Sequence, residues 1–131
     1  MNNKSLFIAV EGLDGSGKST ISKMVVDQLN ERFPNRVQHS FEPHDASCGG
    51  QWIRDVLAKR IPDFSHEALA LAFAANRKDH NDRVIGPWLE GGEGRILITD
   101  RYYLSSLVYQ STETIEMKEV MYLNRFARKP D

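Results

Sequence analysis

Gly12-Leu13-Asp14-Gly15-Ser16-Gly17-Lys18-Ser19 is the stretch of sequence that decides the fold. It has the form G-x-x-x-x-G-K-[ST], the phosphate-binding loop whose backbone N–H groups surround phosphate oxygens. In this loop the lysine reaches the β- and γ-phosphates and the serine hydroxyl binds Mg²⁺. A chance match occurs in on the order of 3 in 100,000 windows at average residue frequencies. The sequence therefore predicts a site for a nucleoside triphosphate with magnesium.

The segments on either side of the loop are of the kinds that such a loop requires. Residues 6–10 form a short apolar run of the buried-strand type. After the loop, apolar residues recur at helical spacing, at Ile21, Met24, Val25 and Leu29. A strand, a glycine loop and a helix in this order bring backbone amides and the positive end of a helix dipole to one point. The alternative is a glycine turn between a strand and a helix that binds no ligand.

Composition narrows the class of protein. The 131 residues are enough for one domain with one core. The net charge of −1 argues against a broad nucleic-acid surface, and no apolar run is long enough to cross a membrane. Cys48 is the single cysteine, which excludes a disulfide framework. The amino-terminal residues do not have the pattern of a signal peptide, so we expect a cytoplasmic protein.

Beyond the first helix the chain alternates between strand-like and helix-like segments. We expect strands at 36–41 and 95–100, helices at 51–59 and from Ser65 onward with Ser65 as the N-cap, a kink or end at Pro87, and a last helical region from Leu104. This order predicts an α/β protein with the three-layer fold of P-loop NTPases, in which helices cover both faces of a parallel sheet.

A second candidate site follows the third expected strand. Asp100-Arg101-Tyr102 comes at the carboxyl end of that strand, the edge at which open α/β sheets bind ligands. A carboxylate there can bind Mg²⁺ or its water shell together with Ser19, and a guanidinium can bind phosphate oxygens. The alternative is an aspartate that caps a turn and an arginine paired with a surface acid.

Four stretches, taken together, resemble thymidylate kinases. Residues 10–20 are similar to the family's opening, and Phe41-Glu42-Pro43 resembles its Arg-Glu-Pro. Residues 71–80 resemble its substrate helix, and residues 100–110 resemble its Asp-Arg-Tyr, Ser-Ser and Tyr-Gln segment. The matches run through the chain in the family's order, and the combination is much more specific than the glycine loop alone.

The resemblance implies transfer of the γ-phosphoryl group of ATP to dTMP, giving dTDP, with Mg²⁺, by a homodimer. It implies that Phe73 stacks on thymine, Arg77 bonds the carbonyl edge of the base, and Asp14 lies near the sugar 3′-hydroxyl. The catalytic set is Lys18, Asp100 and Arg101, and the metal set is Ser19 and Asp100. The ATP-binding set is Gly12, Leu13, Asp14, Gly15, Ser16, Gly17, Lys18, Ser19 and Thr20. The acceptor set is Asp14, Pro43, Phe73, Arg77, Arg101, Ser105, Ser106, Tyr109 and Gln110.

Physical chemistry supports this set. Phe73 and Arg77 are four residues apart, so they share one face of a helix. The acceptor phosphate has a second pKa of about 6, so it is mostly dianionic at neutral pH and needs no general base. Plain core packing remains the alternative for Phe73 and Tyr109, and a solvated helix position for Arg77. Other candidate functions are a deoxynucleoside kinase, which usually shows Glu-Arg-Ser at residues 100–102, and a non-catalytic nucleotide-binding module.

The chain departs from the family in two places. Phe41 stands where many bacterial members carry arginine before Glu-Pro. Lys129-Pro130-Asp131 resembles the residues that open the family's next strand, ahead of its lid and adenine-binding segment. We therefore expect residues 1–131 to be a single P-loop kinase domain that is truncated at the carboxyl end, with an incomplete sheet.

Overall fold

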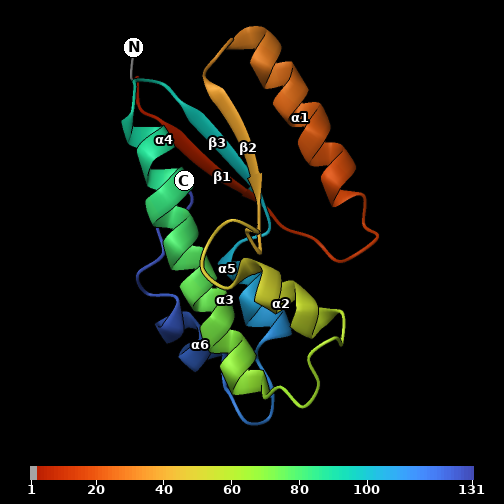
Figure 1. The fold of residues 1–131 in the computed structure, drawn as a ribbon. Coiled ribbons are helices and arrows are strands. Elements are labelled where there is room, and N and C mark those ends of the chain that lie inside the picture. The colour runs from red at the N-terminus through yellow and green to blue at the C-terminus, as the bar shows by residue number, and fades with distance from the viewer. Residues whose placement is uncertain (1–2) are drawn as a thin grey trace.

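The computed structural model describes residues 3–131, which are organised around a parallel sheet (Figure 1). Its strands are β1 (Leu6–Val10), β2 (Val37–Phe41) and β3 (Ile96–Asp100), in the order β1-β3-β2. Each lies within the strand expected from the sequence. For β1 and β3, a short apolar run between turn residues leaves little room for another interpretation.

The register of the sheet brings the candidate sites together. Asp100 lies opposite Val10 of β1 and Phe41 of β2, so the three strands end at one level. The glycine loop follows β1, Glu42 follows β2 and Arg101 follows β3. The residues that come directly after these strands therefore share one edge of the sheet, as open α/β sheets require of a ligand site.

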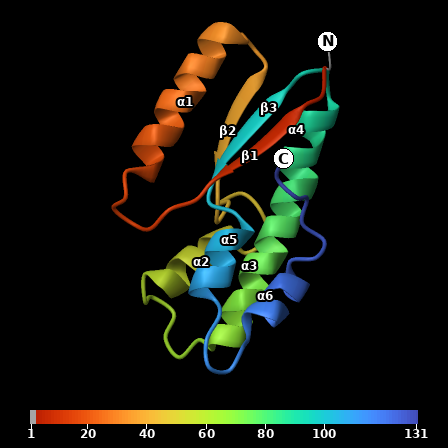
Figure 2. The ribbon, with the colours of Figure 1, turned by 180° about the vertical axis from the view of Figure 1, so that it is seen from behind.

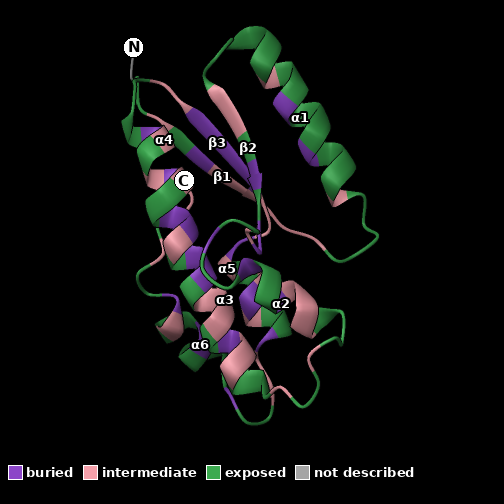
Figure 3. Ribbon diagram, in the orientation of Figure 1, coloured by how far each residue is buried: buried purple, intermediate pink, exposed green. Residues whose placement is uncertain are grey.

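Helices pack on both faces of the sheet, which confirms the expected architecture. On one face, α1 (Lys18–Arg32) packs Val26 against Ile96 and Ile98. On the other face, Phe7 and Leu97 form a cluster with Ile85, Leu89 and Tyr102. Neighbouring residues of β3 point to opposite faces, and Ile96 through Thr99 are buried on both (Figure 3).

The side of α1 that faces the sheet matches its apolar spacing only in part, because Leu29 packs against the cluster of Val26, Ile96 and Ile98 but the other spaced residues do not. Ile21, Met24 and Val25 are exposed, whereas Ser22 and Val26 are buried. Ser22 suits a close contact because it is small and its hydroxyl donates to the Lys18 carbonyl at 2.9 Å. The position of the sheet, rather than the periodicity of the helix, decides which residues are covered.

A long helical rod crosses the other face of the sheet and runs beyond it (Figure 2). It consists of α3 (His66–His80), the π-helical turn η1 (Asn81–Ile85) and α4 (Gly86–Glu90). Ser65 caps its start by accepting a hydrogen bond from the Ala68 N–H at 3.1 Å, as expected. Pro87 does not end the rod, because the wider η1 turn, closed by Gly86 N–H to the Asn81 carbonyl, precedes it.

The remaining helices gather beyond the carboxyl ends of the strands (Figure 1). They are α2 (Gly50–Leu57), α5 (Tyr103–Tyr109) and α6 (Met117–Leu123), and each contacts α3. The expected last helical region is thus two helices. Glu116 and Glu119 form a capping box that starts α6 anew. No helix within residues 3–131 has the length and apolar character needed to cross a membrane.

β1 lies at an edge of the described sheet. It pairs with β3 on one side. On its other side the Phe7 carbonyl accepts a hydrogen bond from the Asp131 N–H at 2.8 Å. The Phe7 N–H donates to the Asp131 carboxylate at 3.0 Å. The last residue of the chain therefore lies alongside β1, at the position of a further neighbour of that strand.

Candidate functional site

The glycine loop forms a cavity of about 270 Å³ at the start of α1. Gly15 and Gly17 have φ values of 75° and 86°, in the left-handed region that glycine adopts without strain. The lining residues are Leu13, Asp14, Gly15, Gly17, Lys18, Ser19, Thr20 and Arg101. The structure therefore brings the expected triphosphate-binding residues together, except that Gly12 and Ser16 lie outside the lining.

Arg101 reaches this cavity through an uncommon backbone conformation. Its φ is 68°, which few non-glycine residues adopt. The peptide is held on both sides, because Arg101 N–H donates to the Val10 carbonyl at 2.9 Å and Tyr102 N–H donates to Glu11 at 2.8 Å. The guanidinium forms an ion pair with Asp14. The strained backbone thus places a cation against the glycine loop.

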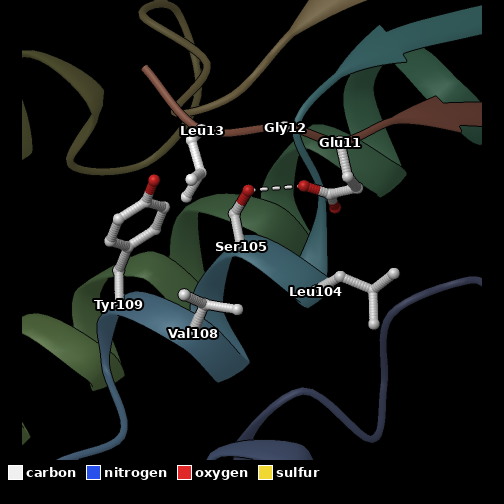
Figure 4. Close-up of a pocket in the computed structure, with 7 residues that line it drawn as sticks. All are labelled: Glu11, Gly12, Leu13, Leu104, Ser105, Val108 and Tyr109. Atoms are coloured by element: carbon white, nitrogen blue, oxygen red, sulfur yellow. Dashed lines mark hydrogen bonds between the residues drawn. The ribbon is translucent and has the colours of Figure 1, made fainter. Parts of the chain in front are cut away.

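Glu11 also ties the loop to α5 (Figure 4). Its second carboxylate oxygen accepts a hydrogen bond from the Ser105 hydroxyl at 2.5 Å. A small cavity of about 240 Å³ lies between the loop and α5, and Leu13 points toward Tyr109 across it. Ser105, expected among the acceptor residues, therefore lines the small cavity and supports the loop.

A larger cavity of about 490 Å³ adjoins the loop. Its lining contains seven of the expected acceptor residues, namely Asp14, Pro43, Phe73, Arg101, Ser106, Tyr109 and Gln110. Asp14 and Arg101 also line the glycine-loop cavity, so the ion pair between them is a wall common to both. The two cavities thus meet at one guanidinium.

Sequence reasoning missed Arg54, which also lines the larger cavity. Its Nη2 donates to the Pro43 carbonyl at 2.9 Å, and its Nε pairs with Asp45. The guanidinium lies 5.8 Å from the centre of the Phe41 ring. The available signal was weak, since Arg54 is merely the single cation of α2. Glu42, Leu57, His66 and Leu69 complete the lining.

Arg77 lies behind the larger cavity rather than on its lining. Its side chain is 2% exposed and its Nε donates to Glu42 at 2.7 Å. Its Nη1 donates to Ser106 at 2.9 Å and to Asn124 at 2.6 Å. The protein itself thus occupies Nε and Nη1. A direct hydrogen bond from Arg77 to a base stays a prediction.

Asp100 is at the expected edge but is engaged with a neighbour. Its Oδ1 lies 3.0 Å from His39 Nε2. Within residues 3–131 no cluster of three acidic, histidine or cysteine side chains is arranged to hold a metal. Magnesium bound with a triphosphate does not need such a cluster, because phosphate oxygens and water supply most of its ligands. Ser19 lines the glycine-loop cavity and fits that requirement.

A pair of histidines lies beneath the Glu42-Pro43 segment. The rings of His44 and His80 are stacked with centroids 4.3 Å apart. Burial and then the neighbouring His80 lower the pKa of His44, and these outweigh the opposing effects of Asp45, Glu42 and Asp79. Protonation of His44 is thus disfavoured in the folded protein.

This shift predicts a stability that depends on pH. Because the pKa of His44 is lower when folded than the ordinary 6.5, the unfolded chain binds more protons below about pH 6.5. The free energy of unfolding should therefore fall as pH drops from 7 toward 5. Urea titrations across this range should show a shallower fall for His44→Asn and an unchanged one for His66→Asn, which alters an exposed histidine. Equal pH slopes for wild type and His44→Asn would contradict the prediction.

Comparison with known proteins places this geometry in a family. The family model described as thymidylate kinase matches residues 10–131. A probable thymidylate kinase of Thermococcus kodakarensis is 44% identical over 96% of this chain and 63% of its own length. A thymidylate kinase of Desulfotalea psychrophila is 37% identical over 99% of this chain and 62% of its own.

Comparison with solved structures points to the same family. The crystal structure of thymidylate kinase from Ehrlichia chaffeensis aligns with a TM-score of 0.85 at 31% identity, covering 98% of this chain and 73% of that one. The chain spans about three fifths of the length of the curated relatives it matches. Sequence and fold agree, and the chain belongs to the thymidylate kinase family.

Proposed function

We propose that this protein transfers the γ-phosphoryl group of ATP to dTMP. A phosphate oxygen of dTMP forms a bond to the γ-phosphorus, the bond from that phosphorus to the β–γ bridging oxygen breaks, and ADP and dTDP leave. The observation that supports this most is the wall common to the two cavities, where Asp14 and Arg101 line both. A group that passes between two nucleotides needs adjoining sites with a cation at the boundary.

The donor side rests on the glycine-loop cavity. Lys18 is proposed to neutralise charge on the β- and γ-phosphates, and backbone amides of residues 12–19 to bind their oxygens. Mg²⁺, when bound, would neutralise charge on the same phosphates. Ser19 is proposed to hold the ion, and Asp100 is proposed to accept hydrogen bonds from its water shell. No general base is required for an acceptor that is already ionised.

On the acceptor side two arginines are proposed to bind the phosphate of dTMP. Arg54 and Arg101 line the larger cavity, and each carries a fork of N–H donors suited to phosphate oxygens. Phe73 and Tyr109 line the same cavity and are proposed to pack on the thymine ring and the sugar. The cavity thus combines cations for a phosphate with aromatic rings for a flat base.

The base itself is selected by hydrogen bonds. Gln110 lines the larger cavity, and its buried Oε1 has no hydrogen-bond partner within residues 3–131. Such an acceptor favours a ligand that brings an N–H, as N3 of thymine does. Ser106 accepts from Arg77, so its own proton remains for a carbonyl such as O4 of thymine. Cytosine reverses both groups, so the pair supports a thymine-like base.

The acceptor panel tests the proposal. In an assay of ADP release by the natural protein at its full length, dTMP should exceed dCMP, dAMP and dGMP in kcat/KM by roughly 100-fold or more. Phe73→Ala should raise the KM for dTMP and change the KM for ATP little. Equal rates with the purine monophosphates would contradict the base assignment. Faster turnover of thymidine than of dTMP would instead indicate a deoxynucleoside kinase.

The homodimer and the cytoplasmic location expected from the sequence are part of the same proposal. Exposed apolar side chains of α3 and α6, among them Leu71, Met121 and Tyr122, support an interface between helices. Sedimentation of the natural protein, in comparison with a Tyr122→Lys variant, measures the oligomeric state.

A further inference from the structure

His80 lines neither nucleotide cavity, yet hydrogen bonds connect it to the acceptor site. It lies on α3 with its side chain fully buried. Its Nδ1 is 2.8 Å from a Glu42 carboxylate oxygen, and its Nε2 is 2.7 Å from the Ser40 hydroxyl on β2. Both ring nitrogens are therefore engaged by groups of known hydrogen-bonding capacity.

The hydrogen bonds continue from Glu42 to the wall of the larger cavity. The other Glu42 oxygen accepts from Arg77 Nε at 2.7 Å. Arg77 Nη1 then donates to Ser106 at 2.9 Å and to Asn124 at 2.6 Å. Glu42 and Ser106 both line the larger cavity, so the chain of bonds starts at the sheet and ends where a nucleotide base is proposed to lie.

Hydrogen-bonding capacity decides the form of the ring. A carboxylate can only accept, so the proton between His80 and Glu42 belongs to Nδ1. Nε2 can then accept the Ser40 proton in a neutral ring. The geometry therefore places a proton on Nδ1, facing Glu42.

We propose that His80 is a positioning residue for the acceptor base, acting through Glu42, Arg77 and Ser106 in turn. The proposal rests on the function proposed above. Without the Nδ1–H donor, Glu42 is free to rotate away from Arg77, and Ser106 loses the donor that directs its hydroxyl proton toward the cavity. The cost falls on acceptor binding, because the glycine-loop cavity has none of these residues in its lining.

Two amide substitutions separate the two ring nitrogens. The amide nitrogen of asparagine falls near the position of Nδ1, and that of glutamine near Nε2. His80→Asn should keep the bond to Glu42 and leave the KM for dTMP within about threefold of wild type. His80→Gln should lose that bond and raise the KM for dTMP about tenfold or more. The KM for ATP should not change in either variant, and Ser40→Ala should resemble His80→Asn.

Equal KM values for dTMP in the two amide variants would overturn the proposal, since the ring would then only fill space. A matching rise in the KM for ATP would also overturn it. If wild type does not phosphorylate dTMP, the proposed function fails, and the hydrogen-bond chain is judged separately.

A measurement on the wild-type protein tests the hydrogen-bond chain independently of activity. It does not depend on whether the variants fold. Two-bond proton–nitrogen correlations of ¹⁵N-labelled histidine, with His80 assigned through its contacts with the His44 ring, report which nitrogen carries the proton. A ring that carries a proton on Nδ1 supports the proposal. A ring protonated on Nε2 alone overturns it.

Discussion

Lys18→Ala is expected to lower kcat by about 100-fold or more in the natural protein at its full length. Lys18 lines the glycine-loop cavity at the first position of α1, beside backbone amides and Ser19. Removing a preorganised positive group that faces charge developing in the transition state costs about 100- to 1,000-fold in rate. Steady-state assays of ADP release, run at saturating ATP and dTMP, measure the effect.

Lys23→Ala is the matched control. Lys23 lies on the same helix, its side chain is 72% exposed, and it pairs with Asp27 at 2.7 Å. Its loss should leave kcat unchanged, because an exposed ion pair one turn apart contributes little. Comparable turnover in the Lys18→Ala and Lys23→Ala variants would contradict the phosphate role of Lys18.

Arg77→Ala is expected to reduce the free energy of unfolding by about 3–5 kcal/mol, because it leaves a buried carboxylate without its cation. Glu42 and Arg77 are each 2% exposed, and their ion pair is 2.7 Å long. Ser106 and Asn124 lose a donor at the same time. Urea denaturation monitored by circular dichroism measures the loss.

Two comparisons isolate the buried pair. Arg83→Ala removes an arginine that is 65% exposed and pairs with Asp79 at 2.7 Å, and it should cost less than about 1 kcal/mol. The double variant Arg77→Met with Glu42→Leu should recover part of the stability, since it leaves no uncompensated charge although His80 and Asn124 lose their partners. An Arg77→Ala variant as stable as Arg83→Ala would show that the buried pair contributes nothing.

The sequence was most informative where the signal is local. The glycine loop, its flanking strand and helix, and the Ser65 cap each depend on neighbours along the chain, and the structure has them where they were expected. Phe73 and Gln110 were placed by resemblance, and both line the larger cavity.

The sequence was less informative where distant segments decide the outcome. Ile21 and Met24 follow helical spacing, but β3 meets the side of α1 that carries Ser22 and Val26. Arg54 reaches the larger cavity because the Glu42-Pro43 segment curves back to meet α2, which no periodicity encodes. The four-residue spacing from Phe73 predicted the helix face on which Arg77 lies but not the burial of its side chain. That burial follows from the ion pair with Glu42.

Under the proposed function, the single wall of Asp14 and Arg101 has a consequence for how the two nucleotides influence one another. A triphosphate that draws the Arg101 guanidinium away from Asp14 alters the charge that the larger cavity presents to the acceptor nucleotide. Thermodynamic linkage makes this effect mutual, so each nucleotide changes the affinity for its companion by the same factor. A dissociation constant measured for one nucleotide alone should therefore differ from the constant measured when the other nucleotide is bound.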